Sequence, residues 1–378
     1  HNFSCKKKNT VKNIFNQIKK NYFLGKEKLL LSLSDQYKYS FDVKKISKFK
    51  RFSIYRIIGM GGSVLGAEAI YNFLKFKIKK KFIFLNTLKS ETNKKSKKNI
   101  LNLVISKSGN TLETITNLNT QKIKSNCIFI TENKNNYLRT IAEKMKCEII
   151  EHKNYIGGRY SVLSEVGMLP AELMGLNEKK FKQFNYLINN KKFINNLINN
   201  VEGILQCVKK GKTNSIILNY DEDSQSFFYW YQQLVAESLG KKSKGILPIV
   251  SQMPKDNHSV MQFYLDGPKN NFFTFFDVFN KKSEKINNSN LLNSHSYLKN
   301  KSVNEIMFAQ RLATEKIFKK KKIPFRSFFV KKKNEQTLGE LFCFFILETI
   351  LLGRALKVNP FDQPSVELIK KETKKILI

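Results

Sequence analysis

Short apolar runs alternate along the chain with longer segments of helical periodicity. Five such runs in the first half are bounded by turn residues or by helical patterns: Ile54–Ile58, Phe82–Leu85, Leu101–Ile105, Ile128–Ile130 and Glu148–Ile150. Continuous apolar runs of this length are typical of buried strands. Their alternation with helices predicts a parallel, doubly wound sheet with helices on both faces. Residues 1–50 differ, because their spaced apolar positions predict a mostly polar helical segment.

A second series of the same kind follows a long helical region from about residue 179 to 210. Its expected elements, in chain order, are a strand at Ser215–Asn219, a helix at Ser224–Leu239, strands at Ile246–Val250 and Phe272–Val278, a helix at Asn304–Lys319 and a strand at Phe325–Val330. Two helices, Leu338–Leu356 and Val366–Ile376, close the chain. The pattern predicts an α/β protein with a helical segment over residues 1–50, sheet domains over 51–175 and 176–335, and C-terminal helices over 336–378.

The charge of the chain is unusual for a globular protein of 378 residues. Lysine and arginine together number 68 against 30 acidic residues, which gives a formal net charge of +38. Only seven of the basic residues are arginine, the side chain best suited to reading phosphates and guanine edges. We therefore expect a solvated, lysine-rich surface, with nucleic-acid binding as the less favoured alternative. The positive field favours small phosphorylated substrates.

The cysteines, the N-terminal stretch and the apolar runs indicate in which cellular compartment the protein is expected. The cysteines, which are odd in number and lack C-x-x-C spacing, are Cys5, Cys127, Cys147, Cys207 and Cys343. This pattern argues against a disulfide framework or a zinc site. The stretch Cys5–Lys20 has no apolar core, so a signal peptide is not expected. The richest apolar run, Leu341–Gly353, contains Glu348 and is shorter than the roughly 20 residues of a membrane span. We expect a buried helix there and a cytoplasmic protein.

Two strand-to-helix turns of the first series are small and hydroxylated. IYRII is followed by Gly59–Ser63 (GMGGS), and LNLVI is followed by Ser106–Thr111 (SKSGNT). Ligands of open α/β sheets bind beyond the carboxyl ends of the strands, where helix N-termini offer free N–H groups to anions. Helix capping alone would explain one such turn, but two favour a phosphate site. Neither turn matches GxGxxG or GxxxxGK[ST], which disfavours a dinucleotide or nucleoside triphosphate site. The candidate ligands are Gly62, Ser63, Ser106, Lys107, Ser108 and Thr111.

Candidate catalytic side chains lie further along the chain. Arg159, beside Gly158 in GGRYS, could stabilise a developing oxyanion. Glu237 shares a helical face with Gln233 and could be a general base. His258 is one of only four histidines and could transfer protons. Each has a plain structural alternative: a surface arginine in a glycine turn, a solvated glutamate, or a structural histidine.

The ordered set GMGGS, SKSGNTLET, GGRYSVLS, AESLGK, DNHSVMQ and NPFDQPSVELIK resembles the phosphoglucose isomerase family, most of all its shorter bacterial members. The resemblance covers roughly residues 50–375. It implies two sugar-isomerase (SIS, flavodoxin-like) domains and no metal or organic cofactor. The implied activity is the reversible interconversion of glucose 6-phosphate and fructose 6-phosphate, a step of glycolysis and gluconeogenesis.

The resemblance also implies roles for residues of this sequence. The two hydroxylated turns would hold the phosphate of a hexose 6-phosphate. Glu237 would move a proton between carbons 2 and 1, Arg159 would stabilise the cis-enediolate, and His258 with Lys370 would open the sugar ring. Lys370 lies in the last motif, in a chain too rich in lysine for it to signal anything alone.

Further implied roles concern substrate contact and assembly. Gln233 matches a substrate-contacting glutamine, and Glu113 matches the carboxylate that orients the histidine. In the family this histidine comes from the neighbouring subunit, which implies a homodimer with shared active sites. Two positions depart from the family pattern, Ser365 for glycine and Glu165 for a small residue or proline, and we expect altered packing there with activity retained. A non-catalytic sugar-phosphate sensor is the alternative, but it would not need Glu237, Arg159 and His258 together.

Overall fold

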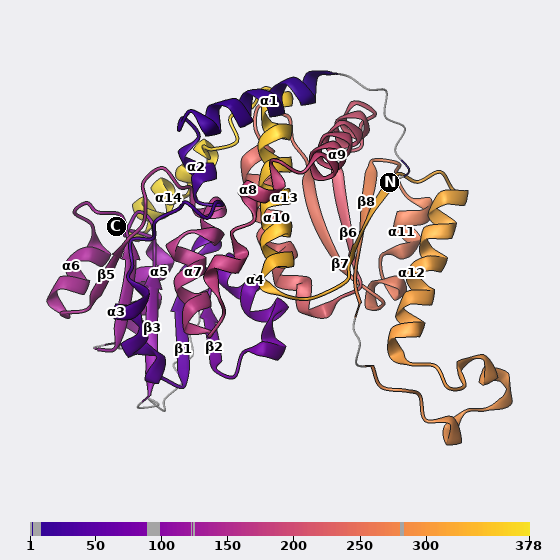
Figure 1. Ribbon diagram of the computed structural model, residues 1–378, viewed down its shortest axis with the longest axis horizontal. Coiled ribbons are helices and arrows are strands. Elements are labelled where there is room, and N and C mark those ends of the chain that lie inside the picture. Colours follow the sequence, from indigo (N-terminus) through magenta and orange to yellow (C-terminus); the bar gives the residue numbers. More distant parts are fainter. Residues whose placement is uncertain (1, 3–8, 89–98, 122, 124, 280–282) are drawn as a thin grey trace.

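The computed structural model describes residues 2, 9–88, 99–121, 123, 125–279 and 283–378. Its first sheet contains five parallel strands in the order β2-β1-β3-β4-β5 (Figure 1). The strands are β1 (Ile54–Ile58), β2 (Lys81–Leu85), β3 (Ile100–Ile105), β4 (Cys127–Thr131) and β5 (Glu148–Glu151). Each begins within one residue of its predicted position, because strands of a buried parallel sheet are recognisable as short, mostly apolar runs.

Helices cover both faces of this first sheet. They are α4 (Leu65–Phe73), α5 (Leu112–Thr120), α6 (Tyr137–Lys144) and α7 (Glu165–Leu173). Ile58 and Val104 belong to the cluster that packs α5 and α6, whereas their neighbours Ile57 and Leu103 belong to the central core. Successive strand residues therefore face opposite sides, as the pleat requires.

The second sheet contains four parallel strands in the order β7-β6-β8-β9. They are β6 (Asn214–Asn219), β7 (Leu247–Gln252), β8 (Asn271–Val278) and β9 (Phe325–Val330). On one face lie α11 (Met261–Asp266) and α12 (Val303–Lys320). On the other lie α9 (Lys191–Lys209), α10 (Gln225–Leu239) and α13 (Glu335–Ala355). Both sheets confirm the predicted doubly wound α/β fold.

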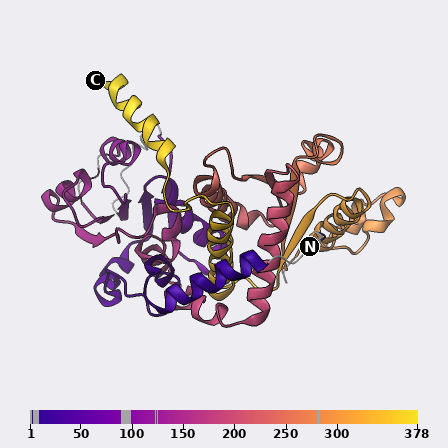
Figure 2. The same cartoon turned by 90° about the horizontal axis from the view of Figure 1, so that it is seen from above.

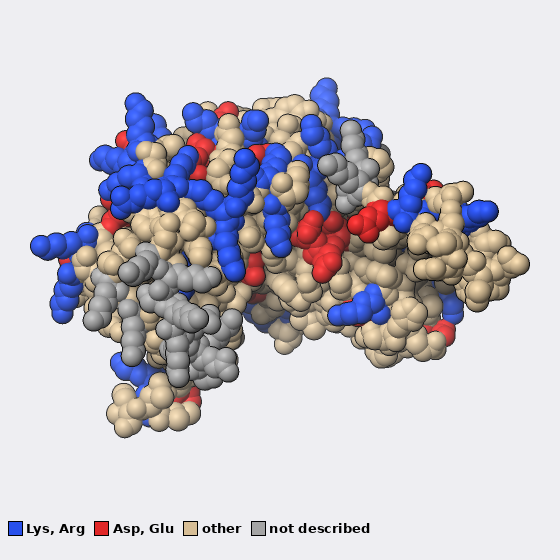
Figure 3. Space-filling model, turned by 90° about the horizontal axis from the view of Figure 1, so that it is seen from below, with Lys and Arg blue, Asp and Glu red and all other residues tan. Residues whose placement is uncertain are grey.

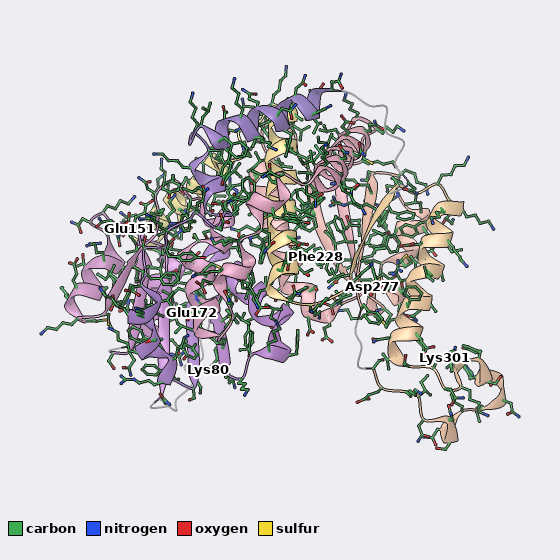
Figure 4. The ribbon with its side chains drawn as sticks, viewed as in Figure 1. Lys80, Glu151, Glu172, Phe228, Asp277 and Lys301 are labelled. Carbon is green, nitrogen blue, oxygen red and sulfur yellow. The ribbon has the colours of Figure 1, made fainter. Side chains whose placement is uncertain are left out.

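One continuous core joins the two sheets. It includes Ile57 of β1 and Ile217 of β6, and α4 and α10 pack against each other between them. Phe228 lies between α10 and the second sheet (Figure 4), with its ring centroid 4.8 Å from that of Phe276. The stretch Leu341–Gly353 forms part of α13 and is almost entirely buried, which confirms the predicted buried helix. No helix in the described part of the chain is long and apolar enough to cross a membrane.

The core of the second half also contains an ion pair. Arg326 of β9 pairs with Glu348 of α13, and both side chains are essentially inaccessible to solvent. Asn200 and Tyr231 complete the hydrogen bonding of the pair. A buried charge is tolerated only with such partners.

The peripheral elements are helical or extended. The N-terminal helices are α1 (Asn9–Phe23), α2 (Lys28–Leu31) and α3 (Val43–Ser47), and α8 (Phe184–Leu187) precedes α9. Residues 283–302 form an arm that leaves the body beside α12 (Figure 1). The last helix, α14 (Pro364–Leu377), has no buried residue and projects from the body (Figure 2). Lysine and arginine are spread over the face in Figure 3, with a patch of acidic residues near its middle.

Candidate active site

The two hydroxylated turns meet at the point where the strand order of the first sheet reverses. β1 pairs with β2 on one side and with β3 on the other, in parallel register. The turns after β1 and β3 therefore leave the same edge of the sheet next to each other. This topological switch point is the usual ligand site of a doubly wound sheet.

The turn after β3 is held in shape by its own hydroxyl groups. Ser106 Oγ and Thr111 Oγ1 are 2.8 Å apart, and the Gly109 N–H donates to Ser106 Oγ at 3.2 Å. Gly109 has a φ of +67°, and a Cβ added there would lie 1.8 Å from Asn136 Oδ1. The conformation therefore requires glycine. Ser108 Oγ accepts from the Asn110 N–H at 3.3 Å, so the loop presents hydroxyl groups just ahead of α5.

The Lys107 ammonium is engaged with a neighbouring loop. Its Nζ donates to the Asn154 carbonyl oxygen at 2.7 Å and lies 3.6 Å from Glu132 Oε1. Burial lowers the pKa of Lys107, and the Glu132 carboxylate opposes this effect. In this structure the side chain fastens the turn to the loop after β5.

The turn after β1 packs directly against the GGRYS segment. A Cβ added at Gly62 would lie 2.2 Å from the Gly158 carbonyl carbon and 2.5 Å from the Arg159 nitrogen. Only glycine at position 62 permits this backbone approach. Ser161 Oγ, which donates to the Gly158 carbonyl oxygen at 2.7 Å, holds the second turn. The contact places Arg159 beside the turn that carries Ser63.

Arg159 is 2 % exposed, and each of its three side-chain nitrogens donates a hydrogen bond. Nε donates to Ser238 Oγ at 2.7 Å, Nη1 to Gln363 Oε1 at 2.8 Å, and Nη2 to the carbonyl oxygens of Pro360 at 2.7 Å and Asp362 at 3.0 Å. Nη1 also forms an ion pair with Glu237 Oε1 at 3.2 Å. The plain alternative of a surface arginine in a glycine turn is therefore wrong. The buried Arg159 guanidinium forms an ion pair with Glu237, the candidate base.

Gln233 and Glu237 lie one helical turn apart on α10, as their spacing predicts. Gln233 Nε2 donates to Glu237 Oε2 at 3.0 Å. Gln233 Oε1 is buried and has no hydrogen-bond partner in the described part of the chain. A Cβ added at Gly61 would lie 2.7 Å from Gln233 Nε2, so the glycine turn and the amide are in close contact. The unpaired amide oxygen is available to a ligand hydroxyl group, since buried acceptors are normally satisfied.

The remaining candidates lie apart from this cluster. His258 is exposed on a 3₁₀ turn after β7, and Lys370 on α14 pairs with Glu367 at 2.7 Å. Glu113, in the first turn of α5, makes no hydrogen bond or ion pair within the described residues. The single chain therefore joins Arg159, Gln233, Glu237 and the glycine turns, and leaves the two ring-opening candidates solvent-exposed.

Three residues of the cluster were not predicted from the sequence. Ser238 follows Glu237 and Tyr160 follows Arg159, and their hydroxyl groups lie 2.9 Å apart. Gln363, in the polar break before α14, contacts Arg159 across 204 positions of sequence. For Ser238 and Tyr160, the only sequence signal was their position next to a candidate residue. The contacts of all three residues with the cluster are visible only in the folded structure.

Comparisons with known proteins agree with this geometry. The model of the phosphoglucose isomerase family matches residues 45–246. The chain is 32% identical over 356 residues to a glucose-6-phosphate isomerase of Methanocaldococcus jannaschii, covering 87% of this chain and 86% of the relative. It is 33% identical over 353 residues to a glucose-6-phosphate isomerase of Mycoplasmopsis pulmonis, covering 85% and 82%. The chain belongs to the phosphoglucose isomerase family.

Solved structures show the same fold. A hypothetical protein of Thermus thermophilus superposes with a TM-score of 0.80 at 24% identity, covering 89% of this chain and 87% of the other. A glucose-6-phosphate isomerase of Chlamydia trachomatis superposes with a TM-score of 0.72 at 19% identity, covering 89% and 72%. This phosphoglucose isomerase family member thus has the expected SIS architecture.

The two departures from the family pattern are not among the hydrogen-bond or ion-pair partners of Arg159 in the described part of the chain. Glu165 is fully buried, and its carboxylate accepts from Tyr37 Oη at 3.0 and 2.9 Å and from the Ser40 N–H at 2.9 Å. Burial, and next the nearby charge of Glu165, raise the pKa of Tyr37. Ser365 is exposed in the first turn of α14. The N-terminal segment therefore supplies the partners that a buried glutamate needs in this phosphoglucose isomerase fold.

Proposed function

We propose that this chain catalyses the reversible interconversion of D-glucose 6-phosphate and D-fructose 6-phosphate. The observation that carries the proposal is the ion pair between Arg159 Nη1 and Glu237 Oε1, 3.2 Å apart, beside the hydroxylated turns. A proton next to a carbonyl group becomes removable when the resulting enediolate oxygen is stabilised. A carboxylate and a guanidinium side by side supply the base and this stabilisation. The relatives from Methanocaldococcus jannaschii and Mycoplasmopsis pulmonis, to which the chain is 32% and 33% identical, are named glucose-6-phosphate isomerases.

In the proposed mechanism the turns after β1 and β3 hold the phosphate. Ser63, Ser106, Ser108 and Thr111 offer hydroxyl groups, and the free N–H groups at the start of α5 and α4 favour an anion. Lys107 contributes positive charge from its place between Asn154 and Glu132. Fixing the phosphate places the open-chain sugar with carbons 1 and 2 at the Arg159 end of the site.

Glu237 then removes the proton from one of these carbons and returns it to the other. Gln233 holds Glu237 Oε2, which leaves Oε1 on the Arg159 side. As the enediolate forms, Arg159 Nη1 donates to its oxygen, and the unpaired Gln233 Oε1 accepts from a substrate hydroxyl group. One carboxylate can serve both carbons, because the proton stays on one face of the planar intermediate.

Ring opening is proposed to need a second subunit. His258 and Lys370 are exposed in the single chain, and the Glu113 carboxylate beside the turn after β3 has no partner within the described residues. In a homodimer, His258 of the partner subunit would lie against Glu113, which would orient its ring. The projecting arm supports a second copy as the neighbour, because it exposes apolar side chains such as Leu292 (73 %) and Tyr297 (69 %). We also propose a cytoplasmic location, since the odd number and the spacing of the cysteines argue against a disulfide framework.

Each part of the chain has its own role in the proposed mechanism. We propose that residues 51–175 form the phosphate-binding SIS domain and residues 176–335 the second SIS domain, which supplies Glu237 on α10. Helices α1 and α3 of the N-terminal segment pack against both domains, and residues 336–378 complete the site through Gln363 and Lys370.

A coupled assay for glucose 6-phosphate formed from fructose 6-phosphate tests the function. We expect activity in the wild type and a loss of about 10²-fold or more in kcat for Glu237→Gln, which keeps the shape but removes the base. Glu340→Gln is the matched control, because its Oε1 also accepts from a glutamine four residues earlier, Gln336, at 3.0 Å on a helix. Full activity of Glu237→Gln would refute the base. An inactive wild type that still binds the sugar phosphate would favour the sensor.

A further inference from the structure

A closed ring of hydrogen bonds lies behind the Arg159 guanidinium. Arg159 Nε donates to Ser238 Oγ at 2.7 Å, and Ser238 Oγ lies 2.9 Å from Tyr160 Oη. Tyr160 Oη donates to the Pro360 carbonyl oxygen at 2.9 Å, and Arg159 Nη2 donates to the same oxygen at 2.7 Å. The ring joins the GGRYS turn, the end of α10 and the segment before α14.

Only one arrangement of hydroxyl protons satisfies all four contacts. Arginine is a pure donor and a carbonyl oxygen a pure acceptor. Ser238 must therefore accept from Arg159 and donate to Tyr160, which must donate to Pro360. Burial raises the pKa of Tyr160, so the phenol keeps the proton that this direction requires.

The ring is closed to solvent and fixed from several sides. Ser238 and Tyr160 are fully buried and Arg159 is 2 % exposed. Trp230 Nε1 donates to the Arg159 carbonyl oxygen at 3.2 Å, and the Tyr160 ring lies 5.2 Å from the guanidinium carbon. A guanidinium held this way cannot rotate without leaving buried donors unpaired, which is costly.

The two edges of the guanidinium differ in what holds them. Nε and Nη2 are bound by the ring and by the Asp362 carbonyl oxygen, which is backbone. Among the described residues, Nη1 has only side-chain partners: it donates to Gln363 Oε1 and forms an ion pair with Glu237 Oε1. Gln363 and Glu237 are accessible to solvent and can rotate away to make room for a substrate oxygen, whereas Ser238 and Tyr160 are fully buried.

We propose that Ser238 and Tyr160 are positioning residues that lock the Nε/Nη2 edge of Arg159, so that Nη1 alone is presented to the enediolate oxygen. This inference rests on the proposed isomerase function. It assigns to the pair a share of transition-state stabilisation, although neither hydroxyl group contacts the substrate. Loss of the lock should weaken binding of the enediolate more than binding of the phosphate group.

Tyr160→Phe and Ser238→Ala test the lock, with Tyr55→Phe as a matched control. Tyr55 is a fully buried tyrosine of β1 whose Oη donates to the Phe49 carbonyl oxygen at 3.0 Å. We expect kcat to fall about 10- to 100-fold in both variants with KM within about threefold, since small misplacements of a catalytic group cost this much. A phosphorylated aldonic acid, which mimics the enediolate, should lose affinity by a similar factor. Inorganic phosphate should inhibit as in the wild type, and Tyr55→Phe should change none of these values.

Several outcomes would contradict the proposal that Ser238 and Tyr160 position Arg159. One is an unchanged kcat in both variants of an active wild type. Another is an equal loss for the aldonic acid and for inorganic phosphate, which would show a general structural defect. Failure of both variants to fold, judged from thermal unfolding, would make the pair structural and would also contradict the inference. An inactive wild type would instead refute the proposed function itself.

Discussion

The backbones of Gly62 and Gly158 are in contact, and this contact joins the glycine turn after β1 to the segment that carries Arg159. A Cβ added at Gly62 would lie 2.2 Å from the Gly158 carbonyl carbon and 2.3 Å from its oxygen. Both atoms belong to backbone, so neither can move aside alone. The distance between Ser63 and Arg159 therefore depends on the absence of one methyl group.

Gly62→Ala should separate the two turns. We expect a fall of about 100-fold or more in kcat/KM for fructose 6-phosphate. The added methyl group would move the turn that carries Ser63 away from Arg159, so a substrate could not contact both in the productive orientation. Overpacking of this kind also lowers the free energy of unfolding, by about 1–3 kcal/mol. The control is Gly157→Ala, whose Cβ would meet only Tyr160 Cδ2 at an ordinary 3.5 Å. If both variants kept wild-type kinetics, the contact would have no role in the site.

Ser106→Ala should weaken phosphate binding. Ser106 is buried, and its Oγ contacts Thr111 Oγ1 and the Gly109 N–H. A hydrogen bond to a charged group contributes about 1.5–3 kcal/mol, so KM for fructose 6-phosphate should rise about 10- to 100-fold with a smaller change in kcat. Inhibition by inorganic phosphate should weaken in parallel. Ser34→Ala, which removes a fully buried hydroxyl donating to the Leu31 carbonyl oxygen at 2.9 Å, should leave KM unchanged. A drop in kcat alone would place Ser106 outside the phosphate site.

Inactive variants should complement each other if active sites are shared between subunits. We expect Glu237→Gln and His258→Ala to be poorly active alone on the cyclic sugar. After dissociation and random reassociation, half of the dimers are mixed, and each mixed dimer has one site free of both changes. Activity should therefore return to about a quarter of the wild-type value. Mixed dimers that form, as two different affinity tags would show, but stay inactive would place His258 in its own subunit's site.

His152 should make the fold sensitive to acid. The side chain is 2 % exposed, its Nδ1 lies 3.1 Å from the Lys153 carbonyl oxygen, and burial lowers its pKa to about 4. The unfolded chain takes up this proton near pH 6.5, whereas the folded chain stays neutral until about pH 4. The free energy of unfolding should therefore fall by about 3 kcal/mol as the pH drops through this window.

Chemical denaturation between pH 7 and 4 measures this slope. His152→Gln should flatten it by about the same 3 kcal/mol, because the group that protonates only in the unfolded chain is gone. His295→Gln, at an exposed position, is the control and should keep the wild-type slope. Parallel curves for the wild type and His152→Gln would contradict the assignment.

The fold was largely predictable, because its determinants are local. The runs IYRII and LNLVI are apolar except for one residue each, Arg56 and Asn102, a pattern that favours strands buried in a parallel sheet. The glycine and hydroxyl pattern of SKSGNT likewise marked a turn ahead of a helix, and Gly109 with its positive φ is at the centre of it. The contact of Lys107 with Asn154 was not predictable, because it depends on where a loop 47 positions away is placed.

The sequence supplied candidate residues for the site, but it did not predict how they are arranged in space. The sequence by itself determined the strands, the glycine turns and the family motifs, because backbone conformation and hydrophobic periodicity depend on neighbours a few residues apart. Only the tertiary structure decided that Arg159 meets Glu237 and Gln363, that Ser238 and Tyr160 close a ring behind it, and that His258 and Lys370 face solvent in one subunit. These relationships join distant segments, and the packing of two sheets around one core sets their distances.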